Sequence, residues 1–157
     1  MKRDAEAIAE RIEPSADLRQ RVVALLRDTG HMQRQLFRRR IRDIPLAPGE
    51  GRVLLYLGGK QGCTQTQLAD LLDIQPITLT RQIDRLEQSG WVVRTPSADD
   101  RRVRLLYLTP EGKTVARRVL KIARTLDDEI TAELDEATLS QLEVGLESMH
   151  AVLTRMK

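Results

Sequence analysis

The stretch Ile74 to Leu86, which reads I-Q-P-I-T-L-T-R-Q-I-D-R-L, combines a helical pattern with side chains able to bind nucleic acid. Pro76 suits the first position of a helix, and Gly90 suits the left-handed stop after it. Ile83 and Leu86, three residues apart, give this helix an apolar side. We expect the hydroxyl, amide and guanidinium groups, which match base edges and phosphates, to lie largely away from that side. They are Thr78, Thr80, Arg81, Gln82 and Arg85.

A capped helix and a tight turn precede this stretch. Thr64 and Gln67 form a capping box that opens a helix running to Leu72, and residues 73–75 make a three-residue turn. A helix, a tight turn and a second helix with polar residues outward form a helix-turn-helix, whose second helix enters the major groove of DNA. Arg and Gln on an outer helix face also serve solubility alone, so the helix needs its neighbours to support this interpretation.

The pattern after Gly90 changes from helical to extended. Residues 91–93 and 103–108 are strand-like, and residues 95–100 form a polar loop between them. Two strands directly after a recognition helix predict a winged helix. Asp100 either pairs with a neighbouring Arg and holds the shape of the wing, or is a solvated loop carboxylate.

Long apolar stripes occur at both ends of the chain. The N-terminal stripe, on a helix ending near Pro45, consists of Leu18, Val22, Leu25, Met32 and Leu36. Residues 48–57 give a short helix stopped by Gly58-Gly59, and Thr109 caps a helix that begins at Pro110. A last helix begins at Asp135 or Thr138 and carries Leu139, Leu142, Leu146, Met149, Leu153 and Met156. These stripes predict a homodimer, since paired recognition helices can meet DNA half-sites one duplex turn apart.

Composition favours one mainly helical domain. The 157 residues are 41% hydrophobic and 3% aromatic, so the core is expected to be aliphatic. The net charge is +3, with seven basic and two acidic residues between positions 31 and 60. We expect a mainly α fold with a small β-wing: a winged helix-turn-helix domain plus N- and C-terminal dimerisation helices.

Several other classes of protein are disfavoured. The single Cys63 excludes an intramolecular disulfide and a multi-cysteine zinc site, and no apolar run approaches 18 residues. His31 and His150 lie at opposite ends of the chain, and no phosphate loop is present, so we expect neither an enzyme nor a cofactor or metal site. A soluble, cytoplasmic protein is expected, with no membrane partner. Cys63, just before a helix N-terminus that would lower its pKa, is either structural or an oxidant sensor.

The segment from Thr64 to Gly90, the wing residues D-D-R-R at 99–102, and the segment L-Y-L-T-P-E-G at 106–112 together resemble the MarR/SlyA family of bacterial transcriptional regulators. The resemblance covers about residues 15–155. It implies a single MarR-type domain over residues 1–157, with dimerisation helices at about 15–43 and 110–156 and the winged helix-turn-helix part at about 46–109. It also implies a homodimer that binds a pseudo-palindromic operator, usually as a repressor released by a small aromatic or phenolic acid.

The resemblance places the recognition helix at Gln75 to Leu86 and a minor-groove arginine at Arg101 or Arg102. The full set expected to contact DNA is Gln75, Pro76, Thr78, Thr80, Arg81, Gln82, Arg85, Arg101, Arg102 and Arg104. A carboxylate effector would be held by the set His31, Arg38, Arg52 and Tyr56, unless these form a solvated face. The alternatives are a non-specific architectural DNA-binding dimer and a redox-responsive regulator acting through Cys63.

Overall fold

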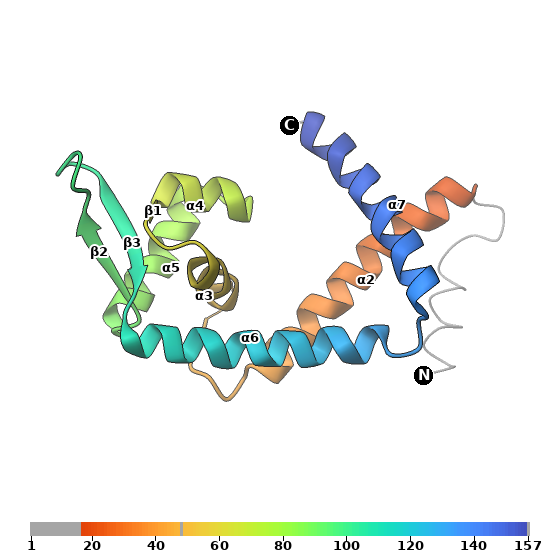
Figure 1. Ribbon diagram of the computed structural model, residues 1–157, viewed down its shortest axis with the longest axis horizontal. Helices are drawn as coiled ribbons and strands as arrows, with labels where there is room; N and C mark the ends of the chain where they lie inside the picture. The colour runs from red at the N-terminus through yellow and green to blue at the C-terminus, as the bar shows by residue number, and fades with distance from the viewer. Residues whose placement is uncertain (1–16, 48, 157) are drawn as a thin grey trace. The chain divides into compact units, whose positions relative to one another are not determined.

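The computed structural model describes residues 17–47 and 49–156, and the chain divides into two compact units, Met1–Pro48 and Gly49–Lys157 (Figure 1). In the first unit, helix α2 spans Leu18–Arg40, which confirms the predicted long helix. Residues 41–44 follow as a turn, in which Ile44 donates its backbone N–H to the carbonyl of Ile41. The charged residues at positions 1–13 predict a lead-in before this helix, and that segment lies outside the described residues.

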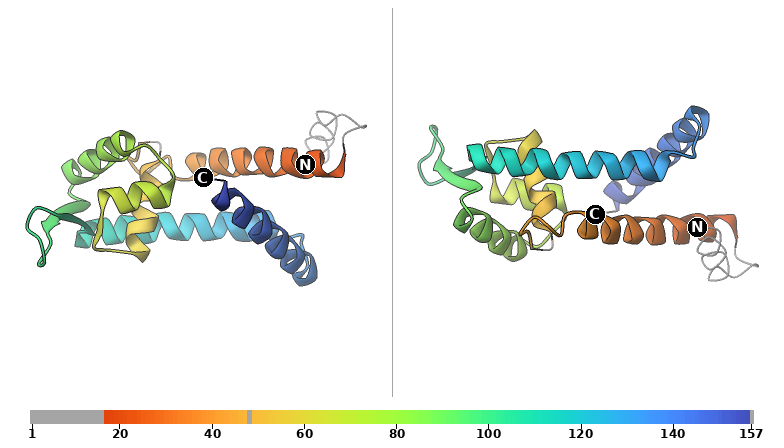
Figure 2. Two further views of the ribbon diagram at one scale, coloured as in Figure 1. Left: turned by 90° about the horizontal axis from the view of Figure 1, so that it is seen from above. Right: turned by 90° about the horizontal axis from the view of Figure 1, so that it is seen from below.

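The second unit contains five helices and three strands in the part of the chain that is described. In chain order they are α3 (Glu50–Gly59), β1 (Cys63–Thr64), α4 (Gln65–Leu72), α5 (Pro76–Gln88), β2 (Val92–Pro96), β3 (Arg104–Leu108), α6 (Pro110–Thr131) and α7 (Glu136–Arg155). The strands form an antiparallel sheet in the order β1-β3-β2. Helices α3, α4 and α5 gather at the N-terminal end of α6, and α7 follows from its other end (Figure 2). The predicted class, mainly α with a small β-wing, is confirmed.

Local signals placed most helix ends correctly. Both hydrogen bonds of the Thr64 and Gln67 capping box are present, and Pro76 occupies the first position of α5. Gly90 has a φ of 75°, as expected for the residue after that helix. Thr109 caps α6 and Asp135 caps α7 with their side-chain oxygens.

Several boundaries differ from the prediction. Helix α3 begins at Glu50 instead of Pro48, because Gly49 has a left-handed φ of 91°, and it continues through Gly59. The loop predicted from residue 95 begins later, since Thr95 and Pro96 extend β2. β2 is an edge strand, where a proline costs no hydrogen bond of the sheet. The two-residue strand β1 was not expected, because it is too short to show an alternating pattern.

An aliphatic core holds the winged part together, as the composition predicted. Its fully buried side chains come from α3, α4, α5, β3 and α6. They are Val53, Leu54, Leu57, Leu68, Leu79, Ile83, Leu86, Leu106 and Val119. The spacing of the three core residues on α5, four and then three positions apart, places them on one side of the helix.

The start of α6 is fixed against the end of α5. Thr109 donates its backbone N–H to the carbonyl of Trp91 and its hydroxyl to the carbonyl of Gly90, at 3.1 and 2.7 Å. The Thr109 hydroxyl oxygen also accepts the N–H of Gly112, at 3.0 Å. A Cβ atom on Gly112 would lie 1.9 Å from the Trp91 carbonyl oxygen. The first turn of α6 therefore approaches the backbone more closely than any residue with a side chain permits.

Replacing Gly112 by alanine should consequently destabilise the winged part. The added methyl group must displace backbone, so we expect Gly112→Ala to lower the free energy of unfolding by about 3 kcal/mol in urea titrations. Gly59→Ala is the matched control, because no atom lies within 4 Å of its added Cβ. The control should change the free energy of unfolding by less than about 1 kcal/mol. Equal effects of the two substitutions would contradict the close contact.

Candidate nucleic-acid interface

The first half of α5 exposes Ile77 together with polar and small side chains. Thr78 and Arg81 are exposed, as are Gln75 and Pro76 at the helix start. The opposite side of the helix supplies Leu79, Ile83 and Leu86 to the core. Since the core fixes the rotation of α5 about its axis, these exposed residues form one face, on which Arg81 carries a positive charge.

Gln82 does not belong to this face. Only 7% of the residue is exposed, so the expectation that it points outward was wrong. Helical spacing gives the reason, because Gln82 lies three residues after Leu79 and four before Leu86. A Cβ on Gly49 would lie 2.4 Å from the Gln82 amide nitrogen, so the start of α3 packs directly on this side chain.

Arg85 is partly held by the protein itself. Its Nε donates to Oε1 of Glu50 at 2.6 Å, and this carboxylate is buried. About half of the Arg85 side chain, 52%, remains exposed. The ion pair therefore fixes the guanidinium at the α3–α5 junction and leaves part of it open to an anion such as a phosphate.

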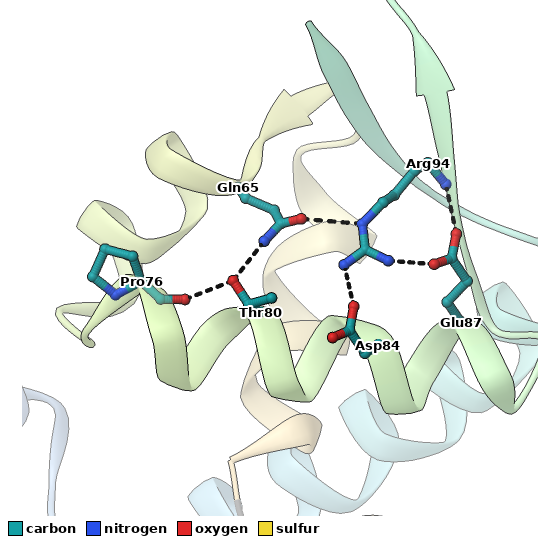
Figure 3. A network of polar contacts seen from close by, with 6 residues as sticks. All are labelled: Gln65, Pro76, Thr80, Asp84, Glu87 and Arg94. Carbon is teal, nitrogen blue, oxygen red and sulfur yellow. Dashed lines mark hydrogen bonds and ion pairs between the residues drawn. The ribbon is translucent and has the colours of Figure 1, made fainter.

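Thr80 has already used its hydroxyl proton. Its Oγ1 donates to the carbonyl of Pro76 at 3.0 Å and accepts from Nε2 of Gln65 at 3.1 Å (Figure 3). A threonine hydroxyl has one proton and two lone pairs, so only an acceptor site is left. Thr80 can therefore accept a hydrogen bond from a base but cannot donate one without breaking the bond to Pro76.

The wing tip exposes three of the predicted arginines. Arg101 and Arg102 lie in the turn, and Arg104 opens β3. Asp100 accepts the backbone N–H of Arg102 at 2.8 Å, and its own carbonyl accepts the N–H of Val103 at 2.9 Å. The expected pairing of Asp100 with an arginine thus takes place through the backbone and not through a guanidinium, and it fixes the shape of the turn.

Sequence reasoning missed Arg94, the central residue of the polar network in Figure 3. Its guanidinium donates to Oε1 of Gln65 at 3.0 Å, to Oδ1 of Asp84 at 2.6 Å and to Oε2 of Glu87. Its backbone N–H donates to the other oxygen of Glu87, at 3.4 Å. Asp84 and Glu87, three residues apart on one helix face, were the available signal that a cation must lie nearby.

The four residues expected to hold an effector belong to different units. His31 and Arg38 lie on α2, where His31 shares a 2.6 Å hydrogen bond with Gln35. Arg52 and Tyr56 lie on α3, and Arg52 donates to the carbonyl of Leu72 at 3.2 Å, the last residue of α4. Arg52 is therefore engaged in joining two helices of the winged part.

A cavity of about 420 Å³ lies between α3 and the first turns of α6. Its lining is mainly apolar, with two cations one helical turn apart on α6 and no carboxylate. The lining residues are Leu54, Leu55, Gly58, Gly59, Gln61, Leu108, Lys113, Ala116, Arg117 and Leu120. None of the four residues expected to hold an effector lines it, although its volume and composition suit a small organic ligand.

Cys63 is a buried residue of β1, 3% exposed, and pairs with Leu106 of β3. Burial raises the pKa of its thiol, against smaller opposing effects of its own backbone hydrogen bond and of the positive charge on Lys60. A raised pKa reduces the thiolate fraction at neutral pH, and the thiolate is the form that reacts with oxidants. The burial and the pKa both favour the structural role over the sensor. No three described His, Cys, Asp or Glu residues form a group able to hold a metal ion, and no described helix is suited to crossing a membrane.

The rate of alkylation distinguishes the structural role of Cys63 from the sensor role, because Cys63 is the only thiol of the chain. We expect iodoacetamide at pH 7 to label the native protein at least roughly tenfold more slowly than the urea-unfolded protein. The native rate should rise as the pH approaches the raised pKa. Rapid labelling of the native protein at neutral pH would contradict the structural role.

Comparison with known proteins agrees with this geometry. Residues 46–103 match the MarR family model. The chain is 32% identical over 90 residues to the multiple antibiotic resistance protein MarR of Salmonella typhimurium, and 28% identical over 89 residues to the HTH-type transcriptional regulator BilQ of Clostridium symbiosum. These matches cover 56% and 57% of the chain, and 62% of each relative, so the chain spans less than two thirds of either relative's length.

A solved structure extends the similarity over more of the chain. The transcriptional repressor CouR, bound to a 23-mer DNA duplex, is 29% identical with a TM-score of 0.72, over 81% of this chain and 90% of CouR. The segment that the family model matches contains α3, α4, α5 and most of the wing. The chain thus contains a MarR family winged helix-turn-helix segment over residues 46–103.

Proposed function

We propose that this chain is a sequence-specific regulator of transcription that binds double-stranded DNA as a homodimer. The observation that carries the proposal is the exposed polar face of α5, bearing Thr78 and Arg81, on a winged part whose tip exposes arginines. Support comes from the similarity to CouR, which was solved on a DNA duplex. The match of residues 46–103 to the MarR family model also agrees with the expectation of a regulator and not an enzyme.

Each exposed group has a suitable partner on a duplex. Arg81 can bind the O6 and N7 atoms of guanine in the major groove, which is the commonest specific contact of arginine. Arg85 has a half-exposed guanidinium anchored to Glu50, which suits a phosphate contact that sets the register of α5. Arg101 or Arg102 at the wing tip would enter an adjacent minor groove, where A·T-rich sequence enhances the negative potential.

A second copy of the chain would cover the apolar residues left exposed outside the winged part. No described residue of α7 is buried, although Leu139, Leu142, Leu146 and Leu153 lie along it. The same holds for α2, with Leu18, Val22, Leu25 and Met32 exposed. Exposed apolar stripes of this length favour association between copies. A two-fold dimer would present two α5 helices to the half-sites of a pseudo-palindrome.

A small aromatic or phenolic acid is proposed as the effector that releases a repressor from its operator. The cavity between α3 and α6 supports this, since Leu54, Leu108 and Leu120 can cover a ring while Lys113 and Arg117 receive a carboxylate. This places the effector on residues other than His31, Arg38, Arg52 and Tyr56. The cavity adjoins the junction of α6 with the winged part, where an added ligand would alter helix packing.

Two neighbouring substitutions on α5 should separate DNA reading from stability. Arg81→Ala removes an exposed base contact, so discrimination between the operator and a scrambled duplex should fall by about 1–3 kcal/mol while the free energy of unfolding is unchanged. Gln82→Ala removes a buried side chain and should lower the free energy of unfolding by roughly 1–3 kcal/mol. Gel-shift competition and urea unfolding on both variants measure the two effects. Loss of stability in Arg81→Ala would contradict the orientation of α5.

The same gel-shift assay separates the proposal from a non-specific architectural DNA-binding dimer. The duplex is selected from a random library with the wild-type protein, and a scrambled duplex of the same composition competes against it. Preference for the selected duplex supports operator reading. Equal affinity for the two duplexes would favour the architectural alternative and overturn the proposal.

The effector site is tested with benzoate and 4-hydroxybenzoate as probes. At a concentration of about 100 times the dissociation constant, either probe should stabilise the native protein by about 2.7 kcal/mol, which is measured as a shift of the melting temperature. Lys113→Met with Arg117→Met should abolish the shift, while Arg118→Met, an exposed residue of α6 outside the cavity, should retain it. An unchanged shift in the double variant would place the effector elsewhere.

A further inference from the structure

We infer that Arg94 is a positioning residue that fixes the wing relative to α5, and so sets the spacing between the DNA segments that the two parts contact. The inference rests on the proposed DNA-binding function and deepens it. Arg94 itself lies at the base of the wing, paired with Leu106 of β3, and not among the tip residues offered to DNA. Its role would be exerted through the groups that it holds together.

The wing beyond Arg94 has no core of its own. No residue from Thr95 to Leu105 is buried, whereas Val92 on β2 and Leu106 on β3 are. Among the described residues, Arg94 is therefore the outermost residue of β2 whose side chain is hydrogen-bonded or ion-paired to an element outside the sheet. β3 is tied to the winged part by its pairing with β1, and Arg94 supplies the corresponding attachment of β2 to α5.

The contacts of Arg94 join three elements at once. Asp84 and Glu87 lie on α5, Gln65 begins α4, and Arg94 lies on β2. The planar guanidinium offers its donors in a fixed fork, so satisfying three acceptors fixes its position as well as its charge. Gln65 continues the network to Thr80, whose hydroxyl is bonded to Pro76 at the start of α5 (Figure 3). The wing, α4 and both ends of α5 are thus connected through polar groups.

The network also removes an electrostatic conflict. Asp84 and Glu87 are 48% and 40% exposed on a helix that would approach phosphates, which repel carboxylates. Arg94 lies against both and compensates their charge. Because Arg94 is held between the two carboxylates, its positive charge is neutralised within the protein and does not contribute to binding phosphates.

If the wing is fixed, the protein recognises the distance along DNA between the site contacted by α5 and the site contacted by the wing tip. One base pair inserted between them moves the outer contact by about 3.4 Å and rotates it by roughly 35°. A wing held at one angle cannot follow this shift, so the contact of Arg101 or Arg102 is lost. A wing released from α5 can follow it, because its tip touches no core.

The experiment uses the full chain and the duplex selected by the wild-type protein from a random library. A second duplex carries one additional base pair between one α5 half-site and the A·T-rich segment outside it, so that one wing contact of the dimer is displaced. The spacing penalty is the ratio of the dissociation constants for the two duplexes. For the wild type we expect a spacing penalty of about tenfold, which corresponds to the loss of one good contact between the wing and DNA.

Two variants break the network while changing the charge in opposite directions. Arg94→Gln removes one positive charge, and Asp84→Asn with Glu87→Gln removes two negative charges. Overall affinity should fall in the first and rise in the second. The spacing penalty should fall below about threefold in both, because both release the wing. Arg94→Lys keeps the charge without the fork and should give an intermediate penalty.

Two controls complete the comparison. Arg118→Gln, on an exposed position of α6, removes the same charge as Arg94→Gln and should keep the wild-type penalty. Arg101→Ala with Arg102→Ala gives the affinity of a protein whose wing contact is missing, and Arg94→Gln should bind the lengthened duplex more tightly than this reference. Thermal melting checks that each variant is folded.

The outcomes distinguish a failure of the proposed DNA-reading function from a failure of the positioning role of Arg94. If the wild type does not prefer its selected duplex over a scrambled one, the DNA-reading function fails. If it does, and either network variant retains the full penalty, the positioning role of Arg94 is wrong. It is equally wrong if the wild type shows no penalty, or if Arg94→Gln matches the Arg101→Ala, Arg102→Ala double variant on both duplexes, since Arg94 would then maintain the wing without setting its position.

Discussion

The buried side of α5 is the constraint on which the rest of the winged part depends. Leu79, Ile83 and Leu86 are fully buried in the aliphatic core and leave α5 a single rotation about its axis. That rotation decides which polar side chains are offered to solvent and which are enclosed. It exposes Thr78 and Arg81 and encloses Gln82, so one pattern of burial determines both the packing and the candidate interface.

Features that depend on neighbouring residues in the sequence were predictable. The capping box at Thr64, the proline at the first position of α5 and the cap at Thr109 are local signals, and each was placed correctly. For α7, the sequence left the start open between Asp135 and Thr138, and Asp135 is the cap. The wing followed from a change of period after Gly90. The family resemblance was also correct, since it rested on several such signals in a fixed order along most of the chain.

Features that depend on contacts distant in the sequence were not predictable. Gln82 is enclosed because α3 packs on it, and Arg94 is enclosed because its two carboxylate partners, seven and ten positions earlier, lie on the adjacent helix face. Strand β1 exists only because β3 lies beside it. The sequence prediction placed polar residues on the surface because of their residue type. Tertiary packing decides their actual surroundings, and it can enclose a polar side chain wherever a hydrogen-bonding partner is available.

Helix α6 connects the winged part to α7 as a single rigid element. Its 22 residues span about 33 Å, and its first turn is locked to the Trp91 carbonyl by Thr109 and by the close approach of Gly112. Any tilt of α6 therefore takes place about its first turn, which lies beside the cavity between α3 and α6. A tilt of about 10° about that turn moves the far end by roughly 6 Å. In a dimer joined through α7, a sub-ångström repacking near Ala116 would therefore produce a larger change in the separation between the two α5 helices. B-form DNA has a fixed helical repeat and does not tolerate such a change.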